Sequence, residues 1–239
     1  ILAFLFTMLL EDYPLHMELT LRHIRDCLNA RGVLGLKNSL LLSAGTALGG
    51  TVIAAFAAYA AARHRGSLAR SVHLLSTLTL SIPGLVLGLA YVLAFKRTAL
   101  YETMGILIFS SIIHFFTTPY LMLYQTFGKL NANLEGTGRV LGVPPFRLFA
   151  NVFLPQCAET LLDMFSYFFL NAMVTISAVS FLATAQTRPL SMLVTQYSDQ
   201  INPEGAAVLS FFILTINLLV RGIVFLLKRL LCTPARAAQ

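Results

Sequence analysis

The sequence contains few charged residues. Only 11% of its 239 residues are Asp, Glu, Lys or Arg, whereas 57% are hydrophobic. An average soluble domain is about 25% charged, so this deficit excludes an ordinary soluble protein. The apolar runs are long and continuous rather than alternating, which argues against a transmembrane β-barrel. With a mean hydropathy of +0.76, the chain is predicted to be an all-α integral membrane protein, a polytopic transmembrane helical bundle.

Paired cysteines and enzyme motifs are also missing. Cys27, Cys157 and Cys232 lie far apart, are odd in number and form no CxxC pair. They therefore indicate neither a disulfide framework nor a zinc site, and we interpret them as small packing residues. The sequence has no Walker glycine loop, HExxH or GxSxG motif. We therefore expect no enzymatic activity and no bound cofactor or metal in this chain.

The chain also lacks the alternation of basic and aromatic residues that is typical of nucleic-acid-binding proteins. Its formal net charge is +7, but the basic residues stand mostly in short connectors between apolar runs. Membrane topology explains such a distribution better than nucleic acid does, so no nucleic-acid partner is expected.

Six membrane spans are predicted from the apolar runs. A spanning helix needs about 20 predominantly apolar residues. The runs cover approximately residues 1–10, 38–62, 72–95, 104–127, 159–185 and 206–227. The first is too short and begins with Ile1 inside the run, so we expect it to be truncated and an N-terminal part of the protein to be missing.

The connectors indicate an orientation. Lys and Arg are frequent in residues 63–71, in residues 128–156 and after the last span, which places these segments in the cytoplasm and 11–37 and 186–205 on the outer side. Residues 17–30 form an expected amphipathic helix, because apolar residues recur at helical spacing: Met17, Leu21, Ile24 and Leu28.

One cytoplasmic connector contains an unusual stretch, LEGTGRVLGVPPFRLFANVFLP, at residues 134–155. We call this stretch the elbow. Gly142 can supply the left-handed residue that ends a helix, and Pro144 or Pro145 can start the next. The second helix places four apolar residues on one face: Phe146, Phe149, Val152 and Phe153. This face suits docking into the groove of a soluble partner, and a connector folded back on the spans is the alternative.

The elbow resembles the EAA loop of ABC-transporter permeases, the membrane subunits of binding-protein-dependent importers. The pattern of that family is E-A-A, three residues, G, nine residues, I, one residue and L-P. Here Gly142, Val152 and Leu154-Pro155 match it, and the acidic position falls on Gly136, with Glu135 one residue earlier. The elbow follows the fourth of six expected spans, as in the family, and the resemblance covers about residues 38–230.

The resemblance implies a MetI-like permease fold and a multi-pass protein of the bacterial cytoplasmic (inner) membrane. It implies that the elbow is the coupling loop of an ATP-driven importer and docks on a cytoplasmic ABC ATPase dimer, which binds ATP and Mg. Further implied partners are a periplasmic solute-binding protein, the lipid bilayer, and a second permease half that is either fused or separate. The expected coupling residues are Glu135, Gly136, Gly142, Pro145, Phe146, Arg147, Phe149, Leu154 and Pro155.

A narrower resemblance concerns residues 81–95, 111–127 and 169–194. They look like permeases of 2-aminoethylphosphonate importers, relatives of the ferric-iron and thiamine permeases, in which two six-span halves are often fused. The chain would match the C-terminal half. The resemblance implies a small phosphonate such as 2-aminoethylphosphonate as solute, with ferric iron or thiamine as alternatives. An ion-coupled secondary transporter is the alternative of another class, although the spans offer few ionisable groups besides His114.

Polar residues within the spans are candidates for a translocation path. They are Thr77, Ser81, Pro83, His114, Asn171, Thr175 and Ser177. Asn171 and Thr175 are expected on one helix face from their i,i+4 spacing. Hydrogen bonding between helices is the alternative role for each. Glu159 and Asp163 share a face near the start of the fifth span, and we expect them to pair with Arg139 or Arg147.

Overall fold

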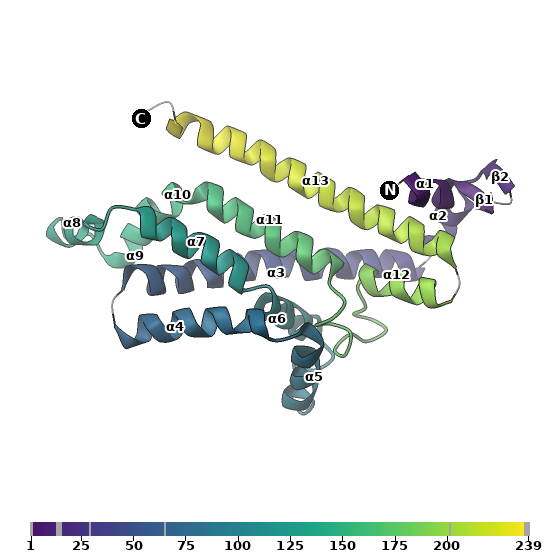
Figure 1. The fold of residues 1–239 in the computed structure, drawn as a ribbon, viewed down its shortest axis with the longest axis horizontal. Helices are drawn as coiled ribbons and strands as arrows, with labels where there is room; N and C mark the ends of the chain where they lie inside the picture. Colours follow the sequence, from purple (N-terminus) through teal and green to yellow (C-terminus); the bar gives the residue numbers. More distant parts are fainter. Residues whose placement is uncertain (1, 13–15, 29, 65, 201, 237–239) are drawn as a thin grey trace. The chain divides into compact units, whose positions relative to one another are not determined.

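Most of the chain is helical. A computed structural model describes residues 2–12, 16–28, 30–64, 66–200 and 202–236. Helices make up the greater part of these residues (Figure 1), and β1 (Leu10–Asp12) pairs with β2 (His16–Leu19) in a short antiparallel sheet. The all-α prediction is therefore confirmed.

The chain divides into two compact units. Unit 1 comprises Ile1–Thr46, Pro83–Ser111 and Phe169–Val220, and unit 2 comprises Ala47–Ile82, Ile112–Phe168 and Arg221–Gln239. Four helices contribute residues to both units: α3 (Ala30–Arg63), α6 (Met104–His114), α11 (Ala158–Val174) and α13 (Pro203–Arg236).

Two hydrophobic clusters lie among the described residues of unit 1. Besides its parts of the shared helices it contains α1 (Leu2–Leu9), α2 (Arg22–Cys27), α5 (Gly84–Phe95) and α12 (Leu190–Asp199). One cluster includes Met173, Leu190 and Val208, and the other includes Leu42 and Leu107. Small residues on α3 let its neighbours approach closely, as is typical of membrane bundles: a Cβ atom at Gly45 would lie only 2.6 Å from Ile108 Cδ1.

Unit 2 contains the elbow. The elbow consists of α8 (Leu134–Val140), α9 (Pro145–Leu148), the π-helical turn η2 (Phe149–Phe153) and the start of α10 (Leu154–Gln156). The other elements of unit 2 are α4 (Ser67–Leu78), the 3₁₀ turn η1 (Thr79–Ser81) and α7 (Thr117–Lys129). Polar contacts tie α4 and η1 to α7. The Thr117 hydroxyl donates to the Ser76 carbonyl at 2.8 Å and lies 2.8 Å from the Thr79 hydroxyl. His73 Nδ1 lies 2.8 Å from the Tyr120 hydroxyl.

The predicted span 72–95 is not one continuous helix. It divides between α4 with η1 and α5, and the two parts are bent by 111°. Ile82, at the break, is extended with φ −104° and ψ 120°. Pro83 explains this conformation, because a proline ring disfavours helical backbone in the preceding residue.

Two more predicted spans differ in the structure. The span 104–127 is broken into α6 and α7, which are bent by 53°. The span 159–185 is shorter than expected, because α11 ends at Val174 and turns follow. In these turns Ser and Thr hydroxyls bond to nearby main-chain groups, such as Ser180 Oγ to the Ser177 carbonyl and the Thr184 N–H to Thr187 Oγ1. Such local bonds compete with helix formation.

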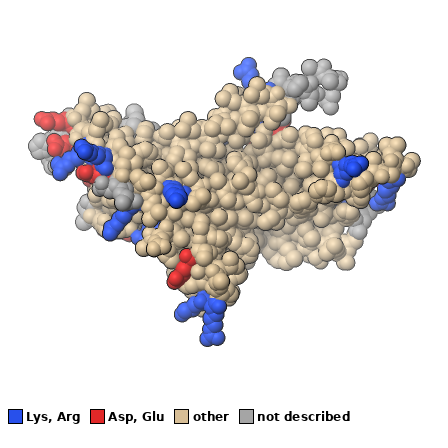
Figure 2. All heavy atoms as spheres, turned by 180° about the vertical axis from the view of Figure 1, so that it is seen from behind, with Lys and Arg blue, Asp and Glu red and all other residues tan. Residues whose placement is uncertain are grey.

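Among the described residues, two helices are long and apolar enough to cross a membrane by themselves. They contain Arg31–Arg63 and Pro203–Leu231, and the number rises to four if each bent pair is one span. On the face drawn in Figure 2, charged side chains stand in small groups separated by wide areas of uncharged residues. The predicted amphipathic helix 17–30 is wrong in extent: its first residues belong to β2, and only Arg22–Cys27 form the helix α2.

Candidate functional site: the elbow between α7 and α11

The turn of the elbow has the predicted geometry. Gly142 follows α8 with φ +68°. The N–H of Gly142 donates to the carbonyl of Arg139 at 3.1 Å, and the N–H of Val143 donates to that of Gly138 at 2.8 Å. This is the pattern in which a left-handed glycine ends a helix. Pro145 is the first residue of α9, so the predicted helix–turn–helix is confirmed (Figure 1).

Replacing Gly142 by Val tests this turn. A Cβ atom at Gly142 meets no atom within 4 Å, so the penalty comes from the backbone alone. We expect about 1–2 kcal/mol of destabilisation, the cost of a left-handed non-glycine residue. Gly136→Ala is the matched control, since it also places Cβ in open space but within a helix. Thermal unfolding should show a lower midpoint for Gly142→Val only; equal midpoints would contradict the interpretation.

The second half of the elbow packs inward. Phe149 and Phe153 are buried, and their ring centroids lie 4.8 and 5.3 Å from that of Tyr59 on α3. Phe127 of α7 completes the cluster, with its ring 5.9 Å from that of Phe153. The expectation that Phe149 and Phe153 belong to an outward docking face is therefore wrong. Burial in an aromatic cluster is the more stable place for these rings.

The exposed apolar residues of the elbow are not the predicted docking face but lie beside the turn. Val140, Leu141 and Phe146 are 88%, 72% and 70% exposed. We call these three residues the elbow patch. Gly136, Pro145, Arg147 and Pro155 are also exposed, and Leu154 is half-buried. All three lie beside the turn between the two helices of the elbow: Val140 ends α8, Leu141 caps it, and Phe146 is the second residue of α9.

Arg63, the last residue of α3, binds the elbow through Glu135. Its Nε and Nη2 atoms donate to the two carboxylate oxygens of Glu135, each at 2.5 Å. Its side chain is only 7% exposed and lies over the ring of Phe153, at 5.1 Å from the centroid. The guanidinium also donates to three carbonyls at and beyond the end of α7: Phe127 at 3.2 Å, Leu130 at 3.1 Å and Asn131 at 2.8 Å.

This arrangement, which we call the Arg63 clamp, fits the planar guanidinium. A bidentate pair with a carboxylate is among the stronger hydrogen-bonded contacts, and the last carbonyls of a helix have no partner within the helix. The hydrogen bonds from Arg63 hold the pKa of the Glu135 carboxyl below its ordinary value. Glu135 is therefore ionised and directed at its own chain, although its position suggested a substitute for the acidic residue of the EAA pattern.

The acidic residues of α11 have another partner than expected. Lys228 Nζ on α13 lies 2.5 Å from Asp163 and 4.0 Å from Glu159. The predicted pairing of these carboxylates with Arg139 or Arg147 is wrong, because Lys228 reaches both from a neighbouring helix.

The candidate path residues have diverse surroundings. The Thr77 hydroxyl donates to the carbonyls of His73 and Leu74 in its own helix, whereas Ser81 and Pro83 are exposed at the bend. His114 Nδ1 and the Thr175 hydroxyl are buried without a hydrogen-bond partner in the described structure. The predicted helix face shared by Asn171 and Thr175 is wrong, because α11 ends at Val174. The Ser177 carbonyl accepts a bond from Ser180.

The structure reveals functional candidates that sequence reasoning missed. In the sequence, Arg63 and Lys228 are simply basic residues of cytoplasmic connectors, and Arg188 is a basic residue of the outer connector 186–205. A single arginine at the end of a long apolar helix was the available signal for Arg63, but nothing near it in sequence identifies Glu135 as its partner.

Known transport proteins resemble the chain in sequence and in fold. Residues 40–231 match the family model described as binding-protein-dependent transport system inner membrane component. Two solved structures share the fold. A bacterial ABC transporter involved in the import of the acidic polysaccharide alginate aligns with a TM-score of 0.78 and 14% identity, covering 95% of this chain and 87% of that one. The alginate transporter in complex with an alginate pentasaccharide-bound periplasmic protein aligns with a TM-score of 0.73 and 13% identity, covering 88% and 82%.

Curated relatives are longer than this chain. The Fe(3+)-transport system permease protein FbpB 2 of Haemophilus influenzae is 28% identical over 195 residues, which is 80% of this chain and 38% of the relative. A spermidine/putrescine transport system permease protein PotC homolog of Mycoplasma genitalium is 29% identical over 124 residues, 50% of this chain and 44% of the relative. The family match covers most of the sequence, and the chain belongs to the inner membrane components of binding-protein-dependent transport systems.

Proposed function

We propose that the chain is a membrane-spanning permease subunit of an ATP-driven ABC importer in a bacterial inner membrane. The observation that carries this proposal is the elbow, a helix–turn–helix that exposes the three large apolar side chains of the elbow patch, in a chain of the inner-membrane-component family. A cytoplasmic ATPase dimer binds ATP and Mg and receives the elbow in a groove. A periplasmic binding protein delivers the solute, and a second permease half, fused or separate, completes the pathway.

The elbow residues have two kinds of role in this proposal. Phe146 and Arg147 are exposed and contact the ATPase, together with Val140 and Leu141. Residues directed inward connect the elbow to the helices: Glu135 through the Arg63 clamp, and Phe149 through the aromatic cluster. A movement of the ATPase groove is thereby passed to α3 and α7 rather than absorbed by a loose loop.

Ferric iron is the favoured solute among the candidates. 2-Aminoethylphosphonate is the solute implied by the narrower sequence resemblance, but the curated relatives described above are named for ferric iron and for spermidine and putrescine. Ferric iron is the one of these solutes that the sequence resemblance also implies, as an alternative to 2-aminoethylphosphonate. Iron is here the transported substrate rather than a resident metal.

Reconstitution tests the function. The full-length protein is purified with the ATPase and binding protein encoded beside its gene and placed in proteoliposomes. We expect ATP-dependent accumulation of radiolabelled ferric iron that requires the binding protein. 2-Aminoethylphosphonate and spermidine are the comparison solutes. Uptake driven by a proton or sodium gradient without ATP would show an ion-coupled transporter instead.

A further inference from the structure

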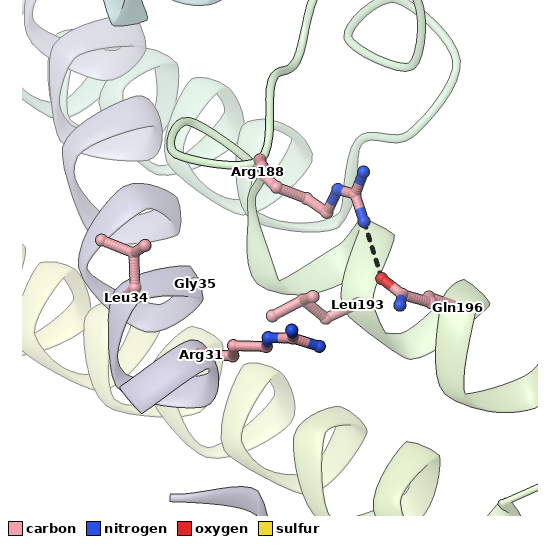
Figure 3. A pocket seen from close by; sticks show the side chains of 7 residues that line it. Arg31, Leu34, Gly35, Arg188, Leu193 and Gln196 are labelled. Atoms are coloured by element: carbon pink, nitrogen blue, oxygen red, sulfur yellow. Dashed lines mark hydrogen bonds between the residues drawn. The ribbon is translucent and has the colours of Figure 1, made fainter. Parts of the chain in front are cut away.

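Unit 1 contains a cavity of about 260 Å³ beside the first turns of α3 and the α12 helix (Figure 3). Two arginines line it: Arg31 near the start of α3, and Arg188 just before α12. Gln196 adds a carboxamide, and Leu34 and Leu193 add apolar surface. None of the described residues that line the cavity is Asp or Glu, and the charged groups among them are the two guanidinium groups.

Arg188 is held in place. Asn38 Nδ2 donates to the carbonyl of Gln186 at 2.7 Å and to that of Arg188 at 3.1 Å. The Leu190 N–H donates to Ser39 Oγ at 2.7 Å. The guanidinium itself is directed along α12, where Nη1 donates to Gln196 Oε1 at 2.7 Å (Figure 3). A group fixed in this way loses little conformational entropy when it binds a ligand.

The Arg188 side chain is not fully satisfied. Its Nε atom is buried without a hydrogen-bond partner in the described structure. The four ion pairs found among the described residues include neither Arg31 nor Arg188. A buried donor without an acceptor is costly, and more so on a charged group. The Arg188 guanidinium therefore has hydrogen-bonding capacity that the described residues do not use.

The size and lining restrict the class of anion. Pockets for drug-sized ligands are about 300–1,000 Å³, so this cavity suits a smaller solute. Guanidinium groups match phosphate-type oxygens through paired N–H donors. Leu34 and Leu193 leave room for a short carbon chain beside such a head group.

We propose that this cavity binds the phosphate or phosphonate group of a small anion through Arg188 and Arg31. The expected topology places its segments on the outer side of the membrane. The site goes beyond the proposed permease function and does not depend on which solute is transported.

Calorimetry tests the proposal on the full-length permease–ATPase complex in phosphatidylcholine nanodiscs. Inorganic phosphate and 2-aminoethylphosphonate are the titrants. We expect saturable binding of at least one. Arg188→Gln should weaken it by at least about tenfold, since it removes charge-assisted bonds. Arg31→Gln should weaken it several-fold, and Arg188→Lys should have an intermediate effect. Arg97→Gln is the matched control, because Arg97 is an exposed arginine of the same unit.

A second series distinguishes a free anion from a lipid head group. The same titrations are repeated in nanodiscs that contain phosphatidylglycerol. If the lipid occupies the site, phosphate binding disappears there and the Arg31 and Arg188 variants retain less phosphatidylglycerol. If the ligand is a free solute, binding is unchanged. The proposal is overturned if neither the anions nor the lipid bind. It is also overturned if both variants, Arg31→Gln and Arg188→Gln, bind as tightly as the unmodified protein. Arg31 is exposed, so its replacement is compatible with folding. Binding requires no ATP hydrolysis, so this outcome is separate from failure of the transport assay.

Discussion

Replacing Arg63 by Ala will detach the elbow from α3 and α7. The guanidinium makes five hydrogen bonds from one largely buried position, to both oxygens of Glu135 and to the carbonyls of Phe127, Leu130 and Asn131. Its removal leaves a carboxylate and three carbonyl oxygens without this partner. Breaking a buried ion pair by removing one partner costs about 3–5 kcal/mol. Because Glu135 is 20% exposed, we expect the lower end, about 3 kcal/mol.

Hydrogen exchange measures this effect locally. A cost of about 3 kcal/mol corresponds to roughly 100-fold faster exchange of the elbow amides, if they open by local unfolding. Arg70→Ala is the matched control, since Arg70 is an exposed arginine of the same unit. Unchanged protection of residues 134–143 in Arg63→Ala would show that the clamp does not hold the elbow.

In the unmodified protein, a fall in pH should also weaken the attachment of the elbow, as Arg63→Ala does. The pKa of Glu135 is lowered by its hydrogen bonds with Arg63. The stabilisation is therefore complete above the ordinary carboxyl pKa and is lost as the pH falls through the lowered value. Glu135→Gln removes this titration, so its elbow protection should depend less on pH. The neighbouring side chains that lower this pKa are Arg63 first, through its hydrogen bonds, and then His64.

The elbow shows which parts of this structure can be predicted from sequence. The turn at Gly142 and the helix start at Pro145 follow from local backbone rules, and both are found. The direction of Phe149 was not predictable in the same way. An apolar helix face beside a membrane can contact the bundle, the lipid or a partner, and periodicity does not distinguish these. The Arg63–Glu135 pair joins residues 72 positions apart, so no local pattern identifies it.

The span boundaries were missed for a related reason. Hydropathy measures whether a segment can be buried, not whether it is helical. Non-helical backbone is tolerated at membrane depth where protein surrounds it. Residues 175–189 are mostly turns, yet Ala178, Val179 and Leu182 are buried, so their apolar character gave the same signal as a continuing helix. Pro83 explains the extended backbone at Ile82, but no local rule predicts the bend of 111°.

Replacing Phe146 by Asp will abolish stable ATPase binding while leaving the permease folded. Phe146 is 70% exposed, so the substitution removes no core contact. If the elbow patch docks in an ATPase groove, Phe146 is the aromatic anchor of that interface. Truncation of such an anchor typically costs about 2 kcal/mol or more, and a carboxylate placed in an apolar groove adds a desolvation cost. We therefore expect the dissociation constant to rise at least about 100-fold and ATP-dependent uptake to be lost.

Two other phenylalanines separate docking from folding. Phe225 of α13 is 64% exposed but lies in an apolar stretch expected in the membrane, so Phe225→Ala should bind the ATPase normally, whereas Phe146→Ala should not. Phe149 is buried in the aromatic cluster, and Phe149→Ala should cost about 3–5 kcal/mol of stability. Its defect should appear as a lower unfolding temperature before any loss of affinity. If Phe146→Asp keeps full affinity and uptake, the elbow patch does not couple this chain to an ATPase. In that case the inward contacts of the elbow, through Arg63 and Phe149, would explain the segment as a structural connector.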